Sequence, residues 1–175
     1  MTSRRFVFIY GVSGSGKTRL ALHVARLASE SGLSVLLVET EPVKSIVSRL
    51  YEGEIRSVSS FDELARVVAQ AALSNRYLVV DSVNSLYLDE PPLARRRTLA
   101  FIASMLKKTG GLAVGQARLR EDGGITSPGL ELISVYADVI AQSQKVGENK
   151  FKLEVLKPER RVMLFRVLEA DVEWL

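Results

Sequence analysis

The sequence predicts an α/β fold: a mostly parallel, twisted sheet with helices on both faces and an antiparallel extension at its C-terminal end. Short apolar runs alternate with helical patterns over the first two thirds of the chain, which is typical of parallel strands joined by right-handed crossovers. A glycine-rich motif joins the first apolar run to the first helical pattern. Closely spaced apolar runs near the C-terminus predict the antiparallel strands. We expect a single domain over residues 1–175.

The first strand, Phe6–Tyr10, leads directly into a phosphate-binding motif. Residues Gly11–Thr18 fit the pattern G-x-x-x-x-G-K-[ST], and apolar residues at helical spacing follow over 19–28. Glycine permits positive φ and close approach to a ligand, so successive N–H groups and the helix N-terminus can surround a phosphate. A glycine-rich turn without a ligand is the plainer alternative. Strand before and helix after are the context that the motif requires, so we predict nucleoside triphosphate binding.

The motif supplies the predicted nucleotide ligands. Lys17 is expected to bridge the β- and γ-phosphates, and the Thr18 hydroxyl is expected to bind Mg²⁺. The residues predicted to bind the nucleotide are Gly11, Ser13, Gly14, Ser15, Gly16, Lys17 and Thr18.

The remaining elements follow in order along the chain. Ser60 and Glu63 have the spacing of a capping box, so a helix is expected to begin there. Gly110-Gly111 ends the long helix before the fifth strand. Strands are predicted at 34–38, 55–58, 76–81, 112–116, 138–144, 151–156 and 162–167, helices at 43–51, 61–73, 93–108 and 128–133, and loops at 82–92 and 118–128.

Polar residues close three of the predicted parallel strands. Asp81 ends an apolar strand, where ligands bind in parallel sheets, and we expect it to support the metal beside Thr18. Glu39 and Glu41 follow another strand, share a face if the strand continues that far, and offer a carboxylate to activate water. Gln116 is placed to contact the γ-phosphate and to report its loss to the next loop. Strand-end caps and solvated acids are the alternatives.

Composition limits the class of protein. A formal charge of +4 and a pI near 9.5 favour an anionic partner only weakly. The sequence has no cysteine, and no apolar run approaches the ~18 residues of a membrane span, so we expect a soluble cytoplasmic protein. Arg95–Arg97 and the pair Arg118 and Arg120 are the basic groups that we consider for contact with a polyanion.

These motifs together resemble the RecA/RadA recombinase superfamily, most closely its short archaeal RecA-like (RadB-like) paralogues. The phosphate loop, Val38–Glu41, Leu78–Tyr87, Val114–Ala117 and Tyr136–Ile140 resemble family segments in the same order. The resemblance implies a RecA-type core with the Gln116 strand between the Gly11 and Asp81 strands. It implies ATP with Mg²⁺, catalysis by Glu41 with Lys17 and Gln116, and single-stranded DNA as the partner.

The resemblance also implies where DNA would bind and where this sequence departs from the family. The loops after Asp81 and Gln116 correspond to the DNA-binding loops. Only a few residues precede the first strand, so filament formation through the family's polymerisation segment is not expected. Lys44 and Arg49 are candidates for stacking on adenine. The residues considered for DNA contact are Arg118, Arg120, Arg95, Arg96 and Arg97.

The sequence therefore predicts a slow Mg²⁺-dependent ATPase that assists recombinational DNA repair by binding single-stranded DNA or a recombinase, with self-association also open. Three alternatives stay open: a KaiC-like regulatory ATPase without DNA binding, a P-loop kinase for a small metabolite, and a nucleotide-binding scaffold without turnover.

Overall fold

One twisted sheet runs through the part of the chain that the computed structural model describes, which is all but residues 1–4, 42–49, 87–90 and 170. Its strand order is β11-β10-β9-β8-β1-β5-β4-β2-β3. Pairing is parallel from β8 to β3 and antiparallel from β8 to β11. The strands are β1 (Phe6–Gly11), β2 (Val35–Glu39), β3 (Glu54–Ser57), β4 (Tyr77–Asp81), β5 (Gly111–Gln116), β8 (Val139–Gly147), β9 (Lys150–Lys157), β10 (Arg161–Val167) and β11 (Val172–Trp174).

The order of β1, β5 and β4 confirms that the Gln116 strand lies between the strands that end at Gly11 and Asp81. Gly11 pairs with Gln116 across β1 and β5, and Glu39 pairs with Asp81 across β2 and β4. The carboxyl ends of these strands therefore meet at one edge of the sheet, which is where parallel sheets bind ligands.

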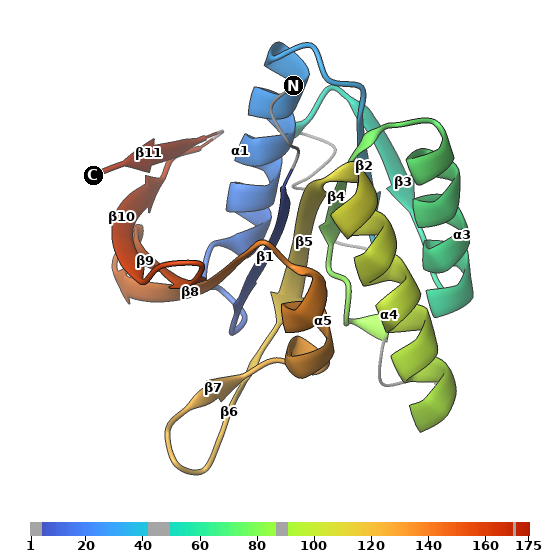
Figure 1. Cartoon of the computed structure of the whole chain (residues 1–175). Coiled ribbons are helices and arrows are strands. Elements are labelled where there is room, and N and C mark those ends of the chain that lie inside the picture. The colour runs from blue at the N-terminus through green and yellow to red at the C-terminus, as the bar shows by residue number, and fades with distance from the viewer. Residues whose placement is uncertain (1–4, 42–49, 87–90, 170) are drawn as a thin grey trace.

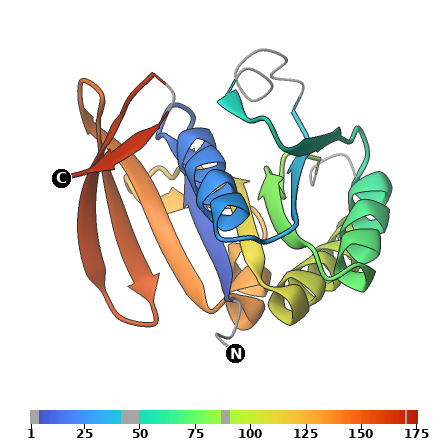
Figure 2. The ribbon, with the colours of Figure 1, turned by 90° about the horizontal axis from the view of Figure 1, so that it is seen from above.

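Helices cover both faces of the sheet. Helix α1 (Lys17–Glu30) lies on one face, and α3 (Phe61–Leu73), α4 (Pro92–Thr109) and α5 (Leu130–Tyr136) lie on the other (Figures 1 and 2). The predicted start of α3 is confirmed, because the Glu63 amide donates to Ser60 Oγ at 3.2 Å. No helix in the described part of the chain is both long and apolar enough to cross a membrane.

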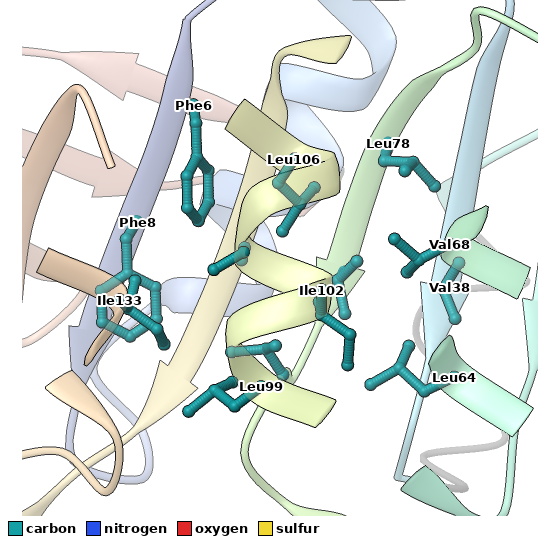
Figure 3. Close-up of a cluster of buried hydrophobic side chains, with 14 of the residues drawn as sticks. Phe6, Phe8, Val38, Leu64, Val68, Leu78, Leu99, Ile102, Leu106 and Ile133 are labelled. Carbon is teal, nitrogen blue, oxygen red and sulfur yellow. The ribbon is translucent and has the colours of Figure 1, made fainter. Parts of the chain in front are cut away.

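The larger core lies between the sheet and helices α3, α4 and α5 (Figure 3). Phe8 of β1 and Leu99 and Ile102 of α4 are all fully buried in it. Burying a side chain of this size stabilises a fold by about 1.5–3 kcal/mol. A second cluster packs α1 against the opposite face of the sheet and against Phe165 of β10. Both faces of the parallel strands are thus buried, which explains why the sequences of these strands are continuous apolar runs.

The C-terminal strands curl around α1 (Figure 2). Trp174 of β11 packs against Phe165, with ring centroids 5.7 Å apart, and its ring centroid lies 6.5 Å from that of His23 on α1. Asp171 accepts a hydrogen bond at 2.6 Å from His23 Nδ1 and forms an ion pair with Arg26. The end of the chain is therefore attached to the helix that follows the phosphate loop.

Acid is expected to weaken this attachment. Burial raises the pKa of Asp171, but hydrogen bonds from the Val172 amide, Arg26 and His23 outweigh burial and lower it from 3.8 to about 2. A carboxyl whose pKa is lower in the folded state stabilises the fold above its ordinary pKa, and the contribution disappears as pH falls toward 2. Asp171 is 40% exposed, so solvent screening limits the effect to about 1 kcal/mol.

Urea unfolding followed by circular dichroism at pH 5 and pH 3 measures this contribution. Between these pH values, Asp171→Asn should lose about 0.5 kcal/mol less stability than the parent, because the variant has no carboxyl to protonate and about half of the contribution is lost by pH 3. Equal decreases in both proteins would contradict the role of Asp171.

Two short elements were not predicted. A hairpin of β6 (Arg118–Leu119) and β7 (Ile125–Thr126) replaces part of the predicted loop, and β11 follows the last predicted strand. Strands of two or three residues are too short to show an alternating pattern. The hairpin closes through the Arg120 amide, which donates to the Gly124 carbonyl at 2.7 Å. Most of the helix predicted at 43–51 lies outside the described residues.

Candidate nucleotide-binding site

The phosphate loop connects β1 to α1 as the motif predicts. Gly14 and Gly16 have φ of +75° and +85°, which residues with a Cβ rarely adopt. Gly16 is the N-cap of α1 and offers no side-chain hydrogen bond to the amides of the first turn. The first amides of a helix have no partner within the helix, so they are available for an anion.

Strand β8 packs tightly against the phosphate loop. A Cβ on Gly11 would lie 2.3 Å from the Ser143 carbonyl oxygen of β8, which is closer than real contacts. The Ser143 hydroxyl is fully buried and donates to the Ser15 carbonyl at 2.6 Å. Strand β8 therefore supports the shape of the loop through Ser143.

Lys17 lies inside the loop. Its side chain is buried, and Nζ donates to the Val12 carbonyl at 2.8 Å and to Ser15 Oγ at 3.3 Å. Burial lowers the pKa of Lys17, and the negative charges of Asp81 and Glu41 oppose that shift. The loop thus holds a cation whose nearby carboxylates only partly compensate for its lost hydration, and a phosphate group would supply further negative charge.

Thr18 and Asp81 are in contact, as predicted for two residues that share a metal. Burial raises the pKa of Asp81, while a hydrogen bond with the Thr18 side chain and the charge of Lys17 lower it. A hydroxyl and a carboxylate are oxygen donors of the kind that Mg²⁺ prefers, and Mg²⁺ sites commonly complete the shell with water and nucleotide phosphates. The residues present therefore fit a Mg²⁺–nucleotide complex. Within the described residues, no cluster of three or more His, Cys, Asp or Glu side chains offers a self-contained metal site.

Glu41 and Gln116 also meet at this site. Gln116 Nε2 donates to Glu41 Oε1 at 3.3 Å, and Ser82 Oγ donates to the same oxygen at 3.4 Å. Glu39 instead accepts from Ser57 Oγ at 3.2 Å, toward β3. Glu39 and Glu41 were expected to share a face only if the strand continued to Glu41, and that condition is not met, because β2 ends at Glu39.

A cavity of about 330 Å³ is lined by the predicted nucleotide-binding and catalytic residues except Gly11, and the predicted metal residue Asp81 does not line it. A larger hollow of about 440 Å³ lies beside Arg96 and Arg120, but none of the phosphate-loop residues lines it. The 330 Å³ cavity is therefore the candidate nucleotide site. Its lining residues are Ser13, Gly14, Ser15, Gly16, Lys17, Thr18, Arg19, Glu41, Gln116, Phe151 and Val167.

Buried polar residues that were not predicted support the strand ends. Thr40 Oγ1 donates to the Ser82 carbonyl at 2.7 Å and accepts from the Ser82 amide at 2.9 Å, which joins the segment before Glu41 to the segment after Asp81. Asn84 is 3% exposed and bonds to the main chain of Gln116. Neither residue stands out in the sequence, because Thr40 lies between two glutamates and Asn84 lies in a segment with several other polar residues.

The basic residues lie outside the cavity. Arg118 and Arg120 are on the exposed β6–β7 hairpin, and Arg120 pairs with Asp122 at 3.4 Å. Arg96, in the first turns of α4, lines the same hollow as Arg120, whereas Arg95 and Arg97 do not line it. Lys44 and Arg49, considered for adenine stacking, lie outside the described residues.

Comparison with models of protein families finds a match, over residues 6–156, to the model described as the CobQ/CobB/MinD/ParA nucleotide binding domain. A search of curated proteins finds no match. The matched family is a different P-loop family from the RecA/RadA recombinases, so the sequence-based recognition of that superfamily is wrong. An α/β fold with a mostly parallel sheet is confirmed, but a RecA-type fold is not. Phosphate loops and strand-end carboxylates recur among nucleotide-hydrolysing proteins, so their presence does not distinguish the families.

Proposed function

The chain belongs to the CobQ/CobB/MinD/ParA nucleotide binding domain family, and from this premise we propose that it binds ATP with Mg²⁺ and hydrolyses the γ-phosphate slowly. The observation that carries the proposal is the placement of Glu41 in the cavity of the phosphate loop, with the Gln116 amide 3.3 Å from its carboxylate. Phosphate binding alone does not require a carboxylate and an amide in the same cavity, whereas activation of water does.

The residues divide the chemistry among them. The loop amides and Lys17 bind the β- and γ-phosphates and stabilise the charge that develops during phosphoryl transfer. Thr18 and Asp81 would hold Mg²⁺, which neutralises phosphate charge when bound. Glu41 orients the attacking water and accepts its proton, and Gln116 fixes the position of that carboxylate.

We expect slow turnover because the site has few cations. Among the described residues that line the cavity, the cations are Lys17 and Arg19. Arg19 Nη1 donates to the Glu169 carbonyl at 2.5 Å, so this guanidinium is already engaged with the C-terminal segment. Related reactions gain about 10³–10⁵ in rate from an arginine finger, often supplied by another molecule.

Phosphate release from ATP by the full chain tests the proposal. Phosphate release should require Mg²⁺ and stop when the metal is chelated. Its rate should reach a plateau as the ATP concentration is raised. Tight ATP binding with no release at any Mg²⁺ concentration would contradict hydrolysis and favour a nucleotide-binding scaffold.

For the partner we propose single-stranded DNA, bound at the β6–β7 hairpin. The hairpin begins two residues after Gln116, carries Arg118 and Arg120, and borders a hollow that Arg96 also lines. The net charge of +4 favours a polyanion, although only weakly. The hairpin exposes Leu119 rather than an aromatic side chain, so we expect weak, salt-sensitive binding without base stacking.

Replacing both hairpin arginines is expected to weaken DNA binding. Fluorescence anisotropy of a labelled oligonucleotide, with ATP and Mg²⁺ at low and moderate salt, should show lower affinity for Arg118→Ala/Arg120→Ala. The slope of log affinity against log salt should decrease by ~0.7 for each phosphate that the variant no longer neutralises. Lys145→Ala/Lys150→Ala, at the β8–β9 turn, is the charge-matched control. No binding by the parent at low salt would exclude DNA as the partner.

A further inference from the structure

We propose that Asn84 is a positioning residue, which acts through the main chain of Gln116 to hold the Gln116 amide against Glu41. Asn84 lies three residues after Asp81 and is almost completely buried, although its side chain is polar. A buried amide of this kind is costly unless its hydrogen bonds are made, so its partners indicate its role.

The side chain of Asn84 bonds to both main-chain polar groups of Gln116. Asn84 Oδ1 accepts from the Gln116 amide at 2.8 Å, and Asn84 Nδ2 donates to the Gln116 carbonyl at 3.0 Å. This pair of bonds fixes the last residue of β5, from which the side chain of Gln116 reaches Glu41. The contact of the Gln116 side chain with Glu41 is a long bond of 3.3 Å, so its position depends on the main chain that carries it.

Ser127 extends the same arrangement to the end of the β6–β7 hairpin. Asn84 Nδ2 lies 3.0 Å from Ser127 Oγ and 3.1 Å from the Pro128 carbonyl, and Ser127 Oγ donates to the Gln116 carbonyl at 2.9 Å. Ser127 is also buried. Asn84 therefore joins three segments: the turn after β4, the end of β5 and the segment that follows the hairpin.

The catalytic consequence rests on the proposed function. Misplacement of a catalytic group by about 1 Å can cost ~10²-fold in rate. We expect Asn84→Ala to lower kcat for ATP about 10- to 100-fold, with KM changed less than about threefold, because the bonds of Asn84 go to Gln116, Ser127 and Pro128 rather than to the phosphate loop. If Asn84 acts through Gln116, the double variant Asn84→Ala/Gln116→Ala should be no slower than Gln116→Ala alone.

A buried polar residue that only stabilises the fold should affect the melting temperature and not kcat. Thr109→Val is the matched control, because Thr109 is buried, bonds to the Met105 and Gly110 carbonyls, and lies next to the opposite end of β5. This variant should lower the melting temperature without changing kcat. Additive rate decreases in the Asn84/Gln116 double variant would overturn the proposal.

Amide hydrogen exchange tests the positioning directly, without turnover. In folded Asn84→Ala, exchange should increase in peptides covering 116–128 and stay unchanged in β1 and α1. If the parent binds ATP but releases no phosphate, the proposed function fails, and hydrogen exchange alone decides the role of Asn84. Unchanged exchange over 116–128 would overturn the inference even in an active enzyme.

Discussion

Lys17→Ala should abolish measurable ATP hydrolysis, with a decrease of about 10²–10³-fold in kcat and a large decrease in ATP affinity. Lys17 is the one lysine among the described residues that line the candidate cavity, and it is 5% exposed. Its attraction to phosphate acts in a partly dehydrated site, where a charge interaction is stronger than in water. Titration with a fluorescent ATP analogue and a phosphate-release assay measure the two effects.

The fold should survive this substitution. Burial lowers the pKa of Lys17, because the charged form loses hydration inside the loop. The melting temperature without nucleotide should therefore change little, whereas stabilisation by added ATP should disappear. Lys108→Ala, on the exposed end of α4, controls for the removal of one positive charge. Parental ATP binding by Lys17→Ala would mean that the phosphate loop is not the nucleotide site.

Glu41→Gln should separate binding from hydrolysis. The amide keeps the shape of the side chain and can still bond to Ser82 and Gln116, but it cannot accept a proton from water. Removal of a general base costs about 10²–10⁴-fold in rate. ATP affinity should be equal to that of the parent or higher, because the substitution removes a negative charge from the cavity and no group that binds phosphate. Single-turnover phosphate release with saturating ATP isolates the chemical step.

Glu39→Gln is the matched control for this result. It removes the same charge two residues earlier, at a carboxylate that faces Ser57 and β3 rather than the phosphate loop. We expect hydrolysis within about threefold of the parent, as for a residue that is not part of the catalytic machinery. If Glu39→Gln greatly decreased the rate of hydrolysis and Glu41→Gln stayed active, Glu39 rather than Glu41 would be the catalytic carboxylate.

Much of the site could be predicted because its residues lie at strand ends. A buried parallel strand is a short apolar run, so the first polar residue after it marks the binding edge of the sheet. Asp81 and Gln116 were located in this way. The divergence of Glu39 and Glu41 was not predicted, because it depends on the residue at which β2 ends.

The supporting residues were harder to predict because their partners are distant in sequence. The Ser143 hydroxyl bonds to a main-chain carbonyl 128 positions away, and Asn84 bonds to a segment 32 positions away. Main-chain partners leave no complementary residue type in the sequence. The family was assigned wrongly because the motifs used for it serve phosphate and metal binding, which unrelated P-loop proteins need equally.

The contact between β11 and α1 places a natural fluorophore next to the helix that follows the phosphate loop. The sequence contains one tryptophan, and its indole lies beside His23 on the helix whose first turn carries Lys17 and Thr18. Intrinsic indole emission therefore comes from a single place, close to the helix that begins at the phosphate loop. If α1 shifts when the loop binds nucleotide, the surroundings of that indole should change, and we expect its emission to report nucleotide exchange on the unlabelled chain.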